Sequence, residues 1–514
     1  MSQFERASGV LLHVTSLPSP YGVGDLGRGA YRFVDFLVQS GQRIWQLLPI
    51  GPTIQCESPY SCYSAFAGNP VLISPELLVA DGFLPSGALQ HIENSDESPR
   101  QADFVHARNI KNELLRESFE FFLGQAGCSE LDEFEAFCTT HKWWLDDFSL
   151  FAALMQHFGN DDWCSWPTEL VTRDSAALGR WREQLSKEVE YEQYVQYLFF
   201  QQWNKLKAYA AANRVQLFGD MPIFVAHGSA DVWANQEVFC LDEGGKSTVV
   251  AGVPPDYFSK TGQLWGNPLY NWKALEQTDY RWWTNRFRMA FQLYDILRID
   301  HFRGFEAYWE VPADAKTAVN GKWAPGPGKA PFDAARRALG ELPIVAEDLG
   351  MITEAVHELR EQLGFPGMRV LQFGFDSADD LFHRPESYPE NSAAYTGTHD
   401  NSTIVGWLKE REGRAAGEDI LQGYLEDPIR SGMPYHWQLI SMVLRSPSDL
   451  AIIPLQDILG LDDDSRMNVP GKAHGNWGWR YEASQLTQEL IDRLKIITIA
   501  SDRESVPMVA EAIH

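Results

Sequence analysis

The chain has 514 residues and a formal net charge of −27, from 43 basic and 70 acidic side chains. This balance repels the phosphate backbone of nucleic acids and anionic membrane surfaces, so we expect neither as a partner. No apolar run approaches the ~18 residues of a membrane span, and the N-terminus lacks the features of a signal or transit peptide. We therefore expect a cytoplasmic protein whose six cysteines, which include no C-x-x-C pair, are free thiols.

Short apolar or β-branched runs that end in turn or polar residues predict eight β-strands, over 9–16, 43–49, 215–224, 296–300, 344–347, 368–373, 393–398 and 451–455. Several of them are nearly continuous rather than alternating, which is typical of parallel strands covered on both faces. Helical spacing of apolar residues predicts helices over 31–39, 282–294 and 353–363. Asn401 or Ser402 is the expected N-cap of a further helix through 406–409. The pattern predicts a parallel (β/α)8 TIM barrel, with a doubly wound sheet as the competing arrangement.

Two gaps between the predicted strands are too long for simple connections. The gap after the second strand exceeds 160 residues and contains helical patterns at 108–122, 131–137, 150–158 and 191–212. We expect a mainly helical insertion over 71–213. The gap after the third strand is rich in Gly, Pro and aromatic residues, and predicts a loop-rich insertion over 225–280 that forms part of a functional cleft. The whole chain, 1–514, is expected to be one catalytic domain.

Ionisable side chains follow four of the predicted strands. The third strand leads to Asp220, the fourth contains Arg298 and Asp300, the fifth ends at Glu347, and the seventh leads to His399 and Asp400. A single acid in such a place often caps the next helix. Four strand ends together indicate chemistry instead, because the C-terminal ends of barrel strands form the active-site face.

Two of these acids have the surroundings that glycoside cleavage needs. Arg298 and Asp300 are two residues apart on a strand, so their side chains leave the same face and the guanidinium favours an ionised carboxylate. Glu347 follows an apolar run, and burial near other carboxylates raises the pKa of such a group. One ionised nucleophile and one protonated acid are the pair that a retaining glycosidase uses.

Three segments carry a family resemblance: 298–305 (RIDHFRGF), 346–350 (AEDLG) and 396–401 (TGTHDN). They resemble the catalytic signatures of the 4-α-glucanotransferases, also called amylomaltases or disproportionating enzymes, in the α-amylase clan. Further matches are 11–27 (LLHVTSLPSPYGVGDLG), 57–70 (ESPYSCYSAFAGNP), 219–224 (GDMPIF), 231–235 (DVWAN), 254–272 (PPDYFSKTGQLWGNPLYNW) and 466–480 (RMNVPGKAHGNWGWR). The resemblance covers nearly the whole chain.

The resemblance implies catalytic roles for three carboxylates: Asp300 as nucleophile, Glu347 as acid/base and Asp400 as transition-state stabiliser. The implied substrate-binding residues are Tyr60, Asp220, Asp256, Trp265, Arg298 and His399. Among these, Arg298 is expected to orient Asp300, and Asp256 and Trp265 are expected to face the glucan from the loop-rich insertion.

The implied reaction moves a segment of a 1,4-α-glucan to the 4-hydroxyl of an acceptor glucose or glucan. Its partners are α-1,4-glucans and malto-oligosaccharides, and no cofactor or metal is expected. The family pattern often has Asp where this chain has Ser402, and tends to have Asp near Gly228. We expect these departures to change loop contacts rather than to remove activity.

Three alternatives compete with glucan transfer. A hydrolase uses the same carboxylates, with water as the acceptor. A non-catalytic glucan-binding barrel is disfavoured because all the carboxylates are present. A nicotinamide dehydrogenase is suggested by G-x-G-x-x-G at 22–27, but the next predicted strand ends at 47–50 (LLPI), without the required acid. The histidines form neither H-E-x-x-H nor a grouping with cysteines at zinc spacing.

Overall fold

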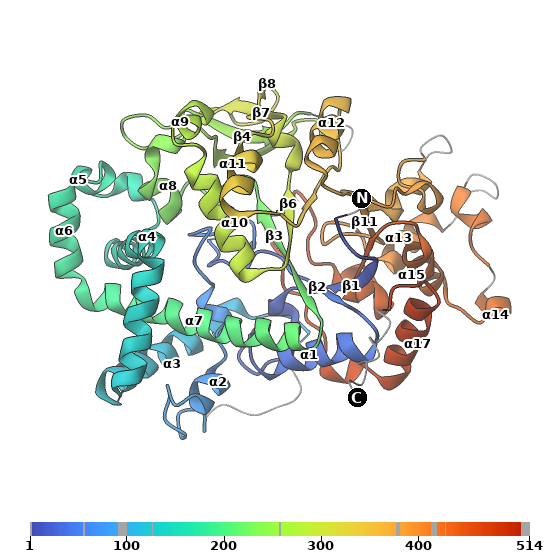
Figure 1. Ribbon diagram of the computed structural model, residues 1–514, viewed down its shortest axis with the longest axis horizontal. Coiled ribbons are helices and arrows are strands. Elements are labelled where there is room, and N and C mark those ends of the chain that lie inside the picture. The colour runs from blue at the N-terminus through green and yellow to red at the C-terminus, as the bar shows by residue number, and fades with distance from the viewer. Residues whose placement is uncertain are drawn as a thin grey trace, which may run out of the picture.

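The computed structural model describes residues 3–54, 57–90, 100–125, 127–255, 259–376, 381–412, 419–426 and 428–504. Eight parallel strands form a closed barrel in the order β1-β12-β11-β10-β9-β6-β3-β2 (Figure 1). Their bounds are β1 Ala7–Leu11, β2 Ile44–Gln46, β3 Gln216–Pro222, β6 Ile296–Asp300, β9 Ile344–Ala346, β10 Gly367–Val370, β11 Ser392–Tyr395 and β12 Leu450–Pro454. Because β1 pairs with both β2 and β12, the sheet closes on itself. The barrel prediction is therefore confirmed, and the doubly wound sheet is excluded.

Helices surround the barrel, and those predicted at 31–39, 282–294 and 353–363 are present. They include α1 Arg28–Gln39, α10 Arg281–Leu293, α11 Ala330–Leu339, α12 Glu354–Leu363, α13 Ile404–Arg411, α15 Tyr435–Arg445 and α17 Gln488–Ile499. The predicted cap of α13 is wrong. Thr403 is the N-cap, and its hydroxyl accepts a hydrogen bond from the Gly406 N–H at 3.1 Å. Asn401 instead closes the preceding turn, where its side-chain oxygen accepts from the Thr398 N–H at 2.9 Å.

The residues between β2 and β3 form helices to one side of the barrel, seen on the left of Figure 1. They are α2 Pro75–Ala80, α3 Phe104–Gln125, α4 Cys128–Phe158, α5 Thr168–Val171, α6 Ser175–Gln184 and α7 Ser186–Ala212. The helical patterns at 131–137 and 150–158 belong to the single helix α4. Trp144 and Phe148 lie between the two patterns and are buried. The Trp144 ring packs against Phe200 of α7, with ring centroids 5.9 Å apart.

A second sheet, which the sequence analysis did not predict, lies beyond the barrel strands at the top of Figure 1. Its antiparallel strands are in the order β5-β4-β7-β8: β4 Val249–Val253, β5 Gln263–Pro268, β7 Ala307–Pro312 and β8 Lys322–Pro325. The first two come from the segment after β3, and the last two come from the segment after β6. The segment 225–280 therefore contains regular structure, together with α8 Ala230–Ala234 and α9 Trp272–Gln277.

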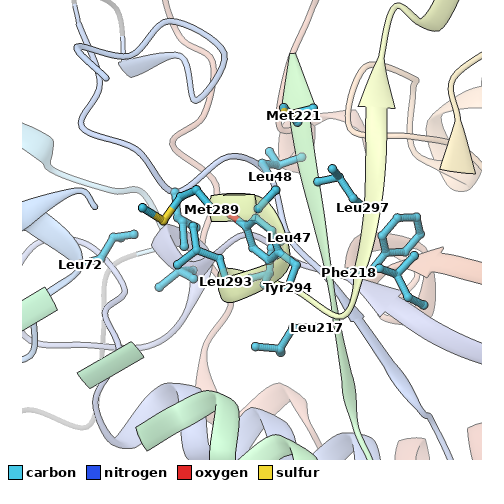
Figure 2. Packing of buried hydrophobic residues seen from close by; sticks show 14 of the residues in the cluster. Leu47, Leu48, Leu72, Leu217, Phe218, Met221, Met289, Leu293, Tyr294 and Leu297 are labelled. Atoms are coloured by element: carbon cyan, nitrogen blue, oxygen red, sulfur yellow. The ribbon is translucent and has the colours of Figure 1, made fainter. Parts of the chain in front are cut away.

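The strands that carry the predicted site are anchored in the core. Figure 2 shows buried side chains of β3 and β6, including Phe218, Met221 and Leu297, with Tyr294 and Leu293 at the end of α10. Gly219 allows this packing, because a Cβ there would lie 2.1 Å from a carbon of the Tyr294 ring. This close contact between Gly219 and the Tyr294 ring fixes the position of β3 one residue before Asp220.

The five cysteines that the structure describes, Cys62, Cys128, Cys138, Cys164 and Cys240, are free thiols. Cys56 lies outside the described residues. Within the described ranges, no helix combines the length and apolarity needed to cross a membrane.

Candidate active site

One arginine joins two carboxylates at the ends of β3 and β6. The strand register places Asp220 opposite Arg298 and Pro222 opposite Asp300. Nη1 of Arg298 donates to both carboxylate oxygens of Asp220, at 2.8 and 2.6 Å, and Nη2 lies 2.8 Å from Oδ1 of Asp300. Burial opposes the charge on Arg298, but the two carboxylates raise its pKa well above the usual value. Burial raises the pKa of Asp220, and the Arg298 guanidinium opposes this rise.

Glu347, directly after β9, is held by two backbone hydrogen bonds. Its Oε2 accepts from the His301 N–H at 2.6 Å, and its Oε1 accepts from the Leu349 N–H at 2.9 Å. Burial and then the Asp300 carboxylate raise the pKa of Glu347 to about 7, although Arg298 opposes this rise. A carboxyl with this pKa is able to give and take a proton near neutrality.

Asp400 follows β11 and is oriented by three neighbours. Its Oδ1 accepts from Nδ2 of Asn468 at 2.6 Å and lies 3.3 Å from Nε2 of His399. Arg466 donates to its backbone carbonyl at 2.9 Å. The carboxylate itself stays partly open to solvent, with 44% of the side chain exposed, so a ligand has access to it.

Tyr60 links this group to the arginine cluster. Its hydroxyl donates to Oδ2 of Asp220 at 2.8 Å, and its ring stacks on His399, with centroids 5.2 Å apart and an interplanar angle of 19°. The Asp300 and Asp400 carboxylates both act electrostatically on Tyr60. Six strand ends or loops thus meet in one cluster at the C-terminal end of the barrel.

Trp265 lies apart from this cluster but contacts it through His301. The Trp265 ring is on β5, and its centroid is 4.8 Å from that of His301 in an edge-to-face arrangement. Of the residues predicted for the site, Asp256 lies outside the described residues.

Four residues in contact with the site were not singled out from the sequence. The His301 N–H donates to Glu347, and the Asn468 side chain donates to Asp400. Arg466 donates to the Asp400 carbonyl and, at 3.1 Å, to the hydroxyl of Ser402. The Trp477 ring lies 5.9 Å from that of His399. All four fall within the matched segments 298–305 and 466–480, but only the three-dimensional contacts show what they touch.

The two departures from the family pattern lie in loops. The hydroxyl of Ser402 accepts a hydrogen bond from Nη1 of Arg466. A Cβ at Gly228 would lie 3.4 Å from the Asp161 carbonyl, which is ordinary contact. No grouping of three or more His, Cys, Asp or Glu side chains among the described residues has the geometry to hold a metal ion.

Comparison with known proteins shows the family to which the chain belongs. The model of the 4-alpha-glucanotransferase family, glycoside hydrolase family 77, matches residues 12–487. The chain belongs to this family. It is 49% identical over 504 residues to the 4-alpha-glucanotransferase of Synechocystis sp., covering 96% of this chain and 97% of that protein. It is 44% identical to the enzyme of Thermus thermophilus, covering 98% and 100%.

Solved structures of family members have the same fold. The amylomaltase of Streptococcus agalactiae, in complex with acarbose, superposes with a TM-score of 0.91 at 39% identity, covering 98% of this chain and 100% of that one. The amylomaltase of Corynebacterium glutamicum, at 18% identity, shares the fold with a TM-score of 0.78 and covers 96% and 75%. Family membership makes the chain an enzyme of the 4-alpha-glucanotransferase type.

Proposed function

We propose that the chain transfers segments of α-1,4-glucans by a retaining, two-step mechanism at Asp300 and Glu347. The observation that carries the proposal is the pairing of two unlike carboxyls. Asp300 is 2.8 Å from the Arg298 guanidinium, while burial beside Asp300 raises the pKa of Glu347 to about 7. One carboxyl suits a nucleophile and the other suits a proton donor.

In the first step, a carboxylate oxygen of Asp300 attacks the anomeric carbon of the sugar to be transferred. The bond from that carbon to the glycosidic oxygen breaks, and Glu347 gives its proton to the departing oxygen. The shortened glucan leaves with a free 4-hydroxyl. The transferred segment remains as an ester on Asp300, and Glu347 is left ionised.

In the second step, the ionised Glu347 takes the proton from the 4-hydroxyl of an acceptor glucose or glucan. The acceptor oxygen attacks the anomeric carbon, and the Asp300 carboxylate leaves. Two inversions at one carbon retain the α configuration. Both steps develop positive charge on the sugar ring, which the nearby Asp400 carboxylate stabilises.

The other predicted residues hold the sugar in place. Asp220 and His399 bond hydroxyls of the sugar under attack, and Tyr60 packs on its ring. Trp265 faces the glucan from the segment 225–280, which we assign to the wall of the glucan cleft. We assign the whole chain, 1–514, to one catalytic domain with 71–213 as its helical insertion.

The retaining mechanism sets a distance that a crystal structure with bound substrate analogue can test. The carboxyl groups of Asp300 and Glu347 are expected to be ~5–5.5 Å apart, because one of them bonds directly to the anomeric carbon. A separation near ~9 Å in the complex leaves room for water between sugar and base, and contradicts the proposal.

Incubation with maltotriose separates transfer from hydrolysis, which uses the same carboxylates. Transfer gives free glucose together with oligomers longer than maltotriose. Hydrolysis gives shortening alone, and that product pattern contradicts the proposed function. The Asp300→Ala variant is the control, because both reactions require the nucleophile.

A further inference from the structure

Each edge strand of the second sheet carries an exposed tryptophan. Trp265 is on β5 and Trp323 is on β8, with 37% and 41% of their surfaces exposed. The guanidinium carbon of Arg303 lies 3.9 Å from the centroid of the Trp323 ring, and Trp309 packs edge-on against the same ring at 5.2 Å. Trp323 keeps this exposure although Arg303 lies over its indole and Trp309 contacts the ring.

Arg303 joins Trp323 to the loop that carries Glu347. It lies in the turn Phe302–Phe305 directly after β6, and its Nη1 donates to the backbone carbonyl of Met351. Met351 follows Glu347 by four residues, and its side chain is also exposed. Burial lowers the pKa of Arg303, and the carboxylates of Glu306 and then Glu347 oppose this, so Arg303 and Glu347 are within electrostatic range.

The place of Trp323 next to the Glu347 loop decides which part of a bound glucan it meets. Glu347 protonates the oxygen that leaves with the shortened glucan and later deprotonates the incoming acceptor. The cluster of Asp220, Tyr60 and His399 surrounds the sugar on the other side of that oxygen. A surface next to the Glu347 loop therefore meets the departing chain and the acceptor.

We propose that the exposed part of the Trp323 side chain is a glucan-binding platform on the acceptor side of the cleft, held in position by Arg303. The proposal rests on the proposed function. A flat indole matches the apolar C–H face of a glucose ring, and Arg303 holds the indole so that little side-chain freedom is lost on binding. The occupant is a malto-oligosaccharide long enough to extend past the reacting sugar, so the platform favours long acceptors over glucose.

The competing explanation is that Trp323 only shields Arg303 and has no contact with sugar. The two explanations differ in how a substitution depends on acceptor length. A purely structural role disturbs the loop of Glu347 and weakens transfer to every acceptor. A platform weakens only the binding of acceptors that reach it.

The test uses α-glucosyl fluoride as a common donor and measures KM for glucose and for maltopentaose as acceptors. Trp323→Ala is expected to raise KM for maltopentaose about tenfold and that for glucose less than about twofold. Trp323→Phe keeps a flat ring and is expected to stay within about threefold of wild type for both acceptors. Trp143→Ala is the matched control, because Trp143 is exposed to a similar degree, 43%, but lies on α4.

Thermal melting of each variant monitors folding. If Trp323→Ala does not fold, Trp323→Leu takes its place, because it keeps apolar volume without a flat ring, and the same dependence on acceptor length is expected. Equal rises in KM for both acceptors, or no rise for maltopentaose, overturn the platform. Wild-type protein that passes the glucosyl group only to water overturns the proposed function and the platform together. Transfer with an unchanged length preference in Trp323→Ala overturns the platform alone.

Discussion

The backbone N–H of His301 lies 2.6 Å from Oε2 of Glu347, so the residue next to the proposed nucleophile also positions the proposed acid/base. His301 has a φ of 57°, in the left-handed region that non-glycine residues rarely occupy. Its ring packs edge to face against that of Trp265. The two carboxyls that we propose as catalytic therefore both adjoin one strained residue at the end of β6.

This relationship predicts different effects for two substitutions of His301. Both His301→Gly and His301→Ala lose the ring contact, but only glycine adopts the left-handed backbone without the cost of roughly 1–2 kcal/mol. We expect kcat/KM on maltotriose to be at least about fivefold lower for the alanine variant than for the glycine variant. Equal values in steady-state kinetics would show that the backbone conformation does not control Glu347.

The raised pKa of Glu347 predicts the pH dependence of the first step. Glu347 must be protonated to release a glucan, so the rate of glycosylation by maltotriose should fall as pH rises above about 7. Fluoride needs little protonation to leave, so its release from α-glucosyl fluoride should show no such decline. Single-turnover rates between pH 5 and 9 compare the two donors. The same decline for both donors would assign the titration to another group.

The same titration predicts a change in stability with pH. Burial raises the pKa of Glu347 to about 7 in the folded protein, from 4.5 for an unperturbed carboxyl. Between these two pKa values the folded protein holds a proton that the unfolded chain releases. The contribution of Glu347 to stability is therefore fully present below about 4.5 and is lost as pH rises through about 7. Glu347→Gln does not ionise, so wild type should lose about 1–3 kcal/mol more than the variant between pH 5 and 8.

Denaturant unfolding at the two pH values measures this difference. In the variant, the amide NH2 of glutamine faces a backbone N–H whose hydrogen bond the Glu347 side chain accepted. The lost hydrogen bond destabilises the variant by the same amount at both pH values. Only the change with pH therefore tests the prediction. Parallel losses of stability in the two proteins would contradict it.

Intact mass measurement separates the two carboxyls by role. Mixed with α-glucosyl fluoride, Glu347→Gln should accumulate one glucosyl group on Asp300, because no base remains to activate an acceptor. Asp300→Ala should remain unlabelled, since it has no nucleophile. Labelling of Asp300→Ala, or labelling of Glu347→Gln at another residue, would overturn the assignment.

The bridge made by Arg298 predicts that lysine does not replace it. An ammonium is a single point charge, so it does not span the carboxylates of Asp220 and Asp300 as the guanidinium does. We expect Arg298→Lys to lower kcat by about a hundredfold or more and to destabilise the fold by roughly 3–5 kcal/mol. Arg100→Lys is the control, because Arg100 pairs with Glu482 on the surface, where solvent screens the pair and such a change costs little stability. Similar losses in the two variants would contradict the argument.

The barrel could be predicted because its strands are local features of the sequence. Each strand is a buried apolar run, and runs such as 344–346 end directly before a charged residue. The cluster at the strand ends was predicted for the same reason, since the C-terminal ends of parallel strands meet. The contact between Arg298 and Asp300 was predictable because residues two apart on a strand point to the same face.

Other features depend on contacts between distant parts of the chain. The pairing of β4 with β7 joins Val250 to Val311, and nothing in the local pattern of β5, whose residues 263–266 are exposed, predicts a strand. Asn468 reaches Asp400 from a loop 68 residues later, so its role has no local signal. The cap of α13 was misassigned because Asn401 and Thr403 are both good capping residues, and only the turn at Thr398 decides between them.

The second sheet has a consequence for rebuilding this enzyme. Its strands come in two pairs from separate connections, and β4 in the first is bonded directly to β7 in the second. During synthesis, β4 emerges with β5 as its available neighbour and gains β7 only after the chain has passed residue 312. A chimera that takes only one of these two segments from a relative would pair β4 of one protein with β7 of another. Exchanging residues 249–268 and 307–325 together keeps the inherited pairing, so these two stretches form one unit for recombination.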